Sequence, residues 1–182
     1  MAAARLWWLL KLIGHSEVAV LDGGFAAWQD AGGDVTRTLT QVPALAAYPG
    51  SFNLDRVVSA EQIAQRLSQS PGWLFDARAP ERFSGQVEPI DPVAGHVPGA
   101  INLPFARMLE NGRFRPAQQL HDALRGVLGQ TDPADAVVMC GSGVTACHLL
   151  LAMEWAGLPG ASLYADSWSG WISDVERPVA RD

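Results

Sequence analysis

The residue in this sequence best placed to do chemistry is Cys140, which follows an apolar, β-branched run. The segment Val137–Thr145 reads Val-Val-Met-Cys-Gly-Ser-Gly-Val-Thr. We expect Gly141 and Gly143 to let the backbone curl with positive φ, so that consecutive N–H groups point inward. A helix that begins directly after this loop adds the positive end of its dipole. The combination favours a thiolate at Cys140 and makes it a candidate nucleophile.

The loop after the cysteine is also suited to hold an anion. Its backbone N–H groups would line a cradle, and the hydroxyls of Ser142 and Thr145 can add donors. We therefore predict that a substrate anion binds to Gly141, Gly143, Val144 and Thr145. The alternative is a cysteine that only fills space in a core, but a packing cysteine does not need a flexible polar loop.

The composition is that of a folded, mildly acidic protein. Of the 182 residues, 48% are hydrophobic and 18% are charged, which suffices for a core and is atypical of a disordered chain. The net charge is -6, and no run of Lys or Arg stands out. Nucleic-acid binding is therefore not expected, because phosphate contacts need a basic surface.

The chain has two cysteines, Cys140 and Cys147. Two thiols in a chain of this size do not form a disulfide framework, so a reducing, cytoplasmic setting is expected. No matching cluster of Cys or His accompanies them, so no metal site is expected. Cys147 lies beside apolar residues and is interpreted as a small core residue rather than a second reacting thiol.

The first residues carry an apolar run, Leu6–Leu10, that is too short to span a bilayer. Lys11 interrupts the run and no clear cleavage site follows, so the pattern is not that of a secretory signal. No membrane association is expected.

An internal repeat accounts for this segment better. Met1–Val35 aligns without a gap with Val144–Pro178, and Gly14 then matches Gly157, an offset of 143 positions. Both stretches read as an apolar helix, a glycine stop, a short strand, which is Val18–Leu21 in the first stretch, and an aromatic helical turn. A fixed offset of this length indicates duplicated domains rather than a solenoid. The alternative is a chance likeness between two helix–glycine–strand units.

The repeat predicts the domain organisation. Residues 1–35 would be the C-terminal remnant of a first, non-catalytic domain that lacks everything before its last helix. Residues 36–56, rich in proline and small residues, would be an interdomain linker. Residues 57–182 would be a complete catalytic domain.

Within residues 57–182, short apolar strands alternate with helices. The predicted strands are 73–76, 100–103, 136–139 and 162–164, and the predicted helices are 60–69, 79–83, 116–128 and 144–155. This alternation indicates an α/β domain with a central parallel sheet flanked by helices. Ligands of such sheets bind beyond the carboxyl ends of the strands, where Cys140 falls.

The loop Cys140–Thr145 resembles the active loop of the rhodanese family, and its mercaptopyruvate branch in particular. Four other segments are similar to family signatures: Asp76–Arg78 with Arg82 and Phe83, Gly95–Ala100, Leu163–Trp171, and Leu21–Trp28 in the first copy. The resemblance covers nearly the whole chain and implies a two-domain rhodanese-like sulfurtransferase with a truncated N-terminal domain.

The resemblance also implies a mechanism without a cofactor. Cys140 would take the outer sulfur of thiosulfate or 3-mercaptopyruvate as a persulfide and pass it to a thiophilic acceptor, cyanide or a thiol such as thioredoxin. Arg82 would hold the anionic end of the donor, and Ser142 would assist proton transfer. Arg78 and His96 would have structural roles. The segment Gln86–Asp91 lacks the second arginine that the mercaptopyruvate branch often carries there, so thiosulfate stays open.

The sequence leaves two functions to compare with a sulfurtransferase. A cysteine phosphatase of this fold needs an arginine six residues after the cysteine, and Ala146 occupies that position. A non-catalytic sulfur-relay or regulatory module is the remaining alternative to an enzyme, and turnover would separate the two.

Overall fold

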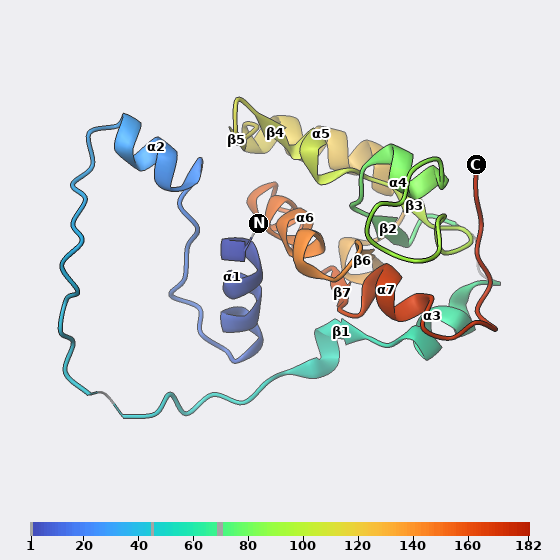
Figure 1. The fold of residues 1–182 in the computed structure, drawn as a ribbon, viewed down its shortest axis with the longest axis horizontal. Helices are drawn as coiled ribbons and strands as arrows, with labels where there is room; N and C mark the ends of the chain where they lie inside the picture. The colour runs from blue at the N-terminus through green and yellow to red at the C-terminus, as the bar shows by residue number, and fades with distance from the viewer. Residues whose placement is uncertain (1, 45, 69–70) are drawn as a thin grey trace.

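The computed structural model of the chain describes residues 2–44, 46–68 and 71–182 (Figure 1). Its centre is a sheet of order β1-β7-β6-β2-β3 in which every neighbouring pair is parallel. The strands are β1 (Val57–Val58), β2 (Leu74–Asp76), β3 (Ile101–Asn102), β6 (Val137–Met139) and β7 (Ser162–Tyr164). A parallel sheet of this kind must be covered on both faces.

Alternate residues of the central strands belong to two separate cores. Phe75, Val138 and Leu163 pack in one cluster, whereas their neighbours Leu74 and Val137 pack in the other. Because successive side chains of a strand point to opposite faces, these are the two faces of the sheet. The expected α/β fold with a parallel sheet flanked by helices is therefore confirmed.

Helices cover both faces. The first core contains residues of α1 (Ala2–Leu12), α5 (Ala117–Leu128) and α6 (Val144–Trp155). The second contains residues of α3 (Ala60–Arg66) and α7 (Ser167–Trp171). The remaining helical elements are α2 (Gly24–Asp30), α4 (Pro80–Ser84) and three short 3-10 turns, Leu54–Arg56, Phe105–Met108 and Pro133–Asp135.

The sheet register positions the site. β2 pairs with β6 so that Asp76 lies beside Met139. Both strands run in the same direction, so the residues that follow them, Ala77 and Cys140, leave the sheet at the same edge. The backbone N–H of Ala77 donates to the carbonyl of Met139 at 2.8 Å and extends this pairing.

The predicted elements of residues 57–182 are present, with ends that differ by a few positions. Helix 60–69 is observed as α3 and ends at Arg66, and positions 69 and 70 lie outside the described residues. The prediction missed β1 and an antiparallel hairpin of β4 (Leu109–Glu110) and β5 (Arg113–Phe114). These strands have two residues each, too few for periodicity, although Asn-Gly between β4 and β5 is a hairpin signal.

The N-terminal helix α1 packs against α6. Trp7 and Trp8 of α1 are buried in the same core as α6, and Lys11 pairs with Glu154 at 3.6 Å. The helix ends at Leu12, which matches Trp155, the last residue of α6, at the offset of 143. The two corresponding helices of the repeat therefore lie against each other.

The segment after α1 differs from its counterpart in the second copy. The short strand expected at Val18–Leu21 does not form, because no neighbouring strand is present beside it among the described residues to pair with. α2 lies away from the sheet, and the chain returns from it to β1 in an extended course (Figure 1). Trp28 is 44% exposed, whereas its counterpart Trp171 is fully buried.

Across the described ranges, no helix is both long enough and apolar enough to cross a membrane.

His148 of α6 gives a test of core packing by pH. Burial lowers the pKa of His148 to about 4, and no described residue forms a hydrogen bond with its Nδ1. The neutral ring packs against Phe105 and Phe114. The unfolded chain takes up the proton below pH 6.5 and the folded chain only near pH 4. The preference of the folded chain for neutral His148 therefore lowers the free energy of unfolding only below pH 6.5. The free energy of unfolding falls as the pH falls from 6.5 toward 4.

We expect His148→Leu to remove that part of the pH dependence. Denaturant unfolding of both chains across this pH range measures it. A stability difference between the two chains that stays constant with pH would contradict the prediction.

Candidate active site

Hydrogen bonds with the first turn of α7 hold the start of the cysteine loop, at Cys140 and Gly141. The backbone N–H of Cys140 donates to Ser167 Oγ at 3.1 Å. The carbonyls of Cys140 and Gly141 accept from the N–H groups of Trp168, at 3.0 Å, and Ser169, at 2.9 Å. Ser167 is a non-glycine residue with φ of 54° whose hydroxyl donates to the carbonyl of Tyr164. The loop conformation thus depends on a helix that follows it by more than twenty residues.

Most of the N–H groups in the loop remain available. Among the described residues, none accepts a hydrogen bond from the N–H of Gly141, Ser142, Gly143 or Val144. In contrast, the carbonyl of Gly143 accepts from Arg5 Nη1 at 3.3 Å and from Cys147 Sγ at 3.3 Å. Bonded carbonyls on one side and unbonded amides on the other are the arrangement that a cradle for negative charge requires.

The two loop glycines serve different purposes. Gly143 has φ of 73°, and a Cβ there would overlap the carbonyl oxygen of Ala165, so only glycine fits. The expectation of positive φ at Gly141 is wrong. A Cβ at Gly141 would lie 3.5 Å from both terminal nitrogens of Arg82, an ordinary contact, so the guanidinium lies directly against this position.

The two thiols have different surroundings. Cys140 is 2% exposed, but Ser142 and Val144 beside it are exposed, so the loop itself reaches the surface. Cys147 is fully buried. Burial raises the pKa of Cys147 against the opposing effect of Arg5. Cys147 therefore behaves as a core thiol, as the sequence predicts.

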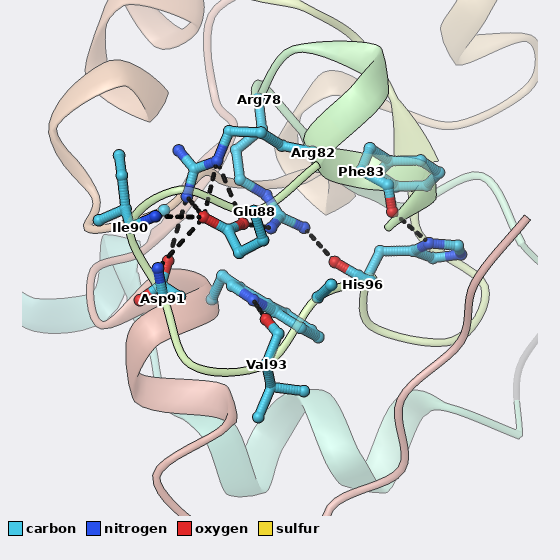
Figure 2. Close-up of polar contacts among 12 residues, drawn as sticks. Arg78, Arg82, Phe83, Glu88, Ile90, Asp91, Val93 and His96 are labelled. Atoms are coloured by element: carbon cyan, nitrogen blue, oxygen red, sulfur yellow. Dashed lines mark hydrogen bonds and ion pairs between the residues drawn. The ribbon is translucent and has the colours of Figure 1, made fainter. Parts of the chain in front are cut away.

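Arg82, the expected anion-binding residue, is brought to the loop and is held there by two carboxylates (Figure 2). Its Nε and Nη2 donate to Glu88, with a shortest distance of 2.7 Å, and Nη2 also reaches Asp91 Oδ2 at 3.1 Å. Burial raises the pKa of Glu88, but the hydrogen bonds from Arg82 and from the backbone N–H groups of Asp91 and Ile90, with the charge of Arg82, together outweigh it and keep this pKa below its usual value.

Arg78 ties strand to loop, as expected. Its guanidinium pairs with Asp76 at 2.7 Å and donates to the carbonyl of Gly95 at 2.8 Å, with both charged side chains buried. Burial raises the pKa of Asp76, and the hydrogen bonds and charge of Arg78 partly offset that effect.

His96 has a structural hydrogen bond, since its Nδ1 lies 2.8 Å from the carbonyl oxygen of Phe83 and its ring stacks on Phe83 (Figure 2).

Sequence reasoning missed four polar residues of this site: Glu88, Asp91, Ser167 and Ser169. Glu88 and Asp91 follow Arg82 by six and nine positions in an irregular loop, so no periodicity marks them. Across the described ranges, no group of three or more His, Cys, Asp or Glu could hold a metal ion.

A buried strand that ends in a cysteine, an amide-lined loop and an α-helix is the arrangement of the rhodanese fold. Residues 59–174 match the Rhodanese-like domain family. The chain belongs to the rhodanese family.

Named relatives extend the match to nearly the whole chain. It is 46% identical over 184 residues to the probable 3-mercaptopyruvate sulfurtransferase of Pseudomonas aeruginosa. It is 40% identical over 185 residues to the putative thiosulfate sulfurtransferase SseB of Mycobacterium tuberculosis. Both alignments cover 98% of this chain and 63% of the relative. The structure of 3-mercaptopyruvate sulfurtransferase from Leishmania major aligns with a TM-score of 0.79 and 30% identity, over 97% of this chain and 50% of that one.

Proposed function

We propose that the chain is a sulfurtransferase that carries a sulfane sulfur as a persulfide on Cys140. The observation that carries this proposal is the loop that follows the cysteine, in which no residue of the described ranges accepts a hydrogen bond from four consecutive N–H groups. Such a loop stabilises the thiolate before the reaction and the terminal sulfur anion of a persulfide after it. The names of the aligned relatives agree with this chemistry.

The reaction consists of two displacements. The Cys140 thiolate attacks the outer sulfur of the donor and forms an S–S bond. The bond between that sulfur and the rest of the donor breaks, and its electron pair leaves with sulfite, or with the enolate of pyruvate, which then takes up a proton. An acceptor thiolate or cyanide next attacks the outer sulfur, and the Cys140 thiolate is regenerated.

Side chains around the loop have distinct tasks. Arg82 binds the anionic end of the donor, since its guanidinium lies against Gly141. The exposed hydroxyl of Ser142 can pass the proton that pyruvate formation needs. The amides of Gly143 and Val144 and the side chain of Thr145 complete the cradle.

The same proposal covers the domain organisation. Residues 1–35 are the end of a second rhodanese-like domain, residues 36–56 a linker and residues 57–182 the catalytic domain. The shared offset of α1 with α6, and of α2 with α7, supports this division. The chain spans less than two thirds of the length of the aligned relatives.

The proposal also includes a thiol acceptor such as thioredoxin and a cytoplasmic location. Neither cysteine forms a disulfide, which agrees with a reducing compartment where such thiols are present.

Mass spectrometry of the intact chain tests the proposal. After incubation with thiosulfate or, separately, with 3-mercaptopyruvate, we expect a gain of about one sulfur mass, located by fragmentation on Cys140. Loss of that mass on addition of cyanide, with repeated turnover, identifies an enzyme. A persulfide that forms once and does not turn over would instead indicate a relay module. No gain with either donor would overturn the proposal.

A further inference from the structure

Arg82, the arginine proposed to bind the donor, is held by two acidic side chains. Two of the three nitrogens of the Arg82 guanidinium, Nε and Nη2, bond to Glu88 and Asp91, and both carboxylates are almost fully buried. No described residue accepts a hydrogen bond from Nη1. A donor anion beside Gly141 can therefore accept hydrogen bonds mainly from Nη1 of the guanidinium.

The charge around this edge is not positive. The connected cluster consists of two guanidinium groups, on Arg78 and Arg82, and three carboxylates, on Asp76, Glu88 and Asp91. With all five groups ionised, the formal charge of the cluster is -1. A second negative charge on an incoming donor is therefore repelled here, and low local solvent exposure weakens the screening of that repulsion.

Asp91 is fixed in its place. While Oδ2 accepts from Arg82, Oδ1 accepts from Ser169 Oγ at 2.7 Å. The same hydroxyl oxygen lies 2.9 Å from the carbonyl of Gly141 in the cysteine loop. Because Arg82 and Ser169 each hold one of its oxygens, the carboxylate of Asp91 is fixed on both sides, next to the cysteine loop.

We infer that Asp91 sets the charge preference of the donor site, favouring a singly charged carboxylate donor over the doubly charged thiosulfate ion. The inference rests on the proposed function and deepens it. 3-Mercaptopyruvate carries one negative charge at neutral pH and thiosulfate two. Asp91 discriminates by repulsion rather than by a contact with the preferred donor.

The variant Asp91→Asn tests this charge effect with little change in shape. We expect the ratio of kcat/KM for thiosulfate to kcat/KM for 3-mercaptopyruvate to rise about tenfold, chiefly through a lower KM for thiosulfate. The rise should shrink at high ionic strength. The matched control is Asp122→Asn on the exposed surface of α5, which should leave the ratio unchanged.

A purely structural role for Asp91 would lower both activities together, so an unchanged ratio overturns the inference while the proposed function stands. A wild-type chain that forms no persulfide overturns the proposed function and the inference with it. Should Asp91→Asn fail to fold, as judged by circular dichroism, the wild-type chain gives an independent measurement. Pyruvate should then inhibit competitively at lower concentration than sulfate, and tighter inhibition by sulfate would overturn the inference.

Discussion

The Cys140→Ser variant is expected to lose sulfur transfer by at least about a thousandfold, because a serine hydroxyl in this loop cannot form a persulfide. The fold should be retained. Serine differs from cysteine by one atom, and the bonds that hold this position use its backbone N–H and carbonyl rather than its side chain. Cyanide-dependent thiocyanate formation measures the activity, and thermal unfolding checks the fold.

Cys147→Ser is the matched control, because it changes the other buried thiol, one turn into α6. We expect the Cys147→Ser chain to keep the persulfide. Its stability should change little, since a serine hydroxyl can take over the bonds that Sγ makes with the Gly143 carbonyl and with Arg5 Nη1 at this buried position. If Cys147→Ser lost the persulfide and Cys140→Ser kept it, the assignment of the nucleophile would be wrong.

Gly143→Ala is expected to have the second largest effect. The residue has φ of 73°, where an L side chain costs about 1–2 kcal/mol. The added Cβ would also overlap the carbonyl oxygen of Ala165, which is backbone and cannot rotate away. The chain between β7 and α7 must then shift, and with it Ser167, Trp168 and the loop that they hold. We expect sulfur transfer to fall by more than about a hundredfold.

Gly157→Ala separates the backbone strain from the steric effect. Gly157 has φ of 70°, and a Cβ there would meet nothing within 4 Å. The variant should lose about 1–2 kcal/mol of stability for its φ alone and keep its activity. Equal losses of activity in the Gly143 and Gly157 variants would show that stability, and not the shape of the loop, governs sulfur transfer.

Regular elements with strong local patterns could be predicted from the sequence. The helix Val144–Trp155 and the strand Ser162–Tyr164 have the predicted bounds, since a glycine precedes and follows the helix and the strand is short and apolar. The strand expected at Val18–Leu21 fails for the opposite reason. An apolar run becomes a strand only when a neighbour supplies hydrogen bonds, and local sequence does not report on neighbours.

Some residues of the candidate site could likewise be predicted from local sequence patterns, and others could not. Cys140, Gly143 and Arg82 lie in patterns that have a mechanism or a family resemblance behind them. Ser167, Ser169 and Asp91 reach the loop through tertiary hydrogen bonds across 27, 28 and 78 positions of sequence. Such long-range partners leave no local trace, so only the folded chain brings them into view.

The hydrogen bonds with Ser167, Trp168 and Ser169 that hold the cysteine loop affect when the site can form during biosynthesis. In the sheet order, β7 sits between β1 and β6, and the turn that grips Cys140 follows β7 directly. A nascent chain whose synthesis has not passed Ser169 therefore lacks both the strand that completes the sheet and the groups that shape the loop. Cys140 is therefore synthesised before the groups that shape its loop, and we expect sulfur transfer to begin only after Ser169 has left the ribosome.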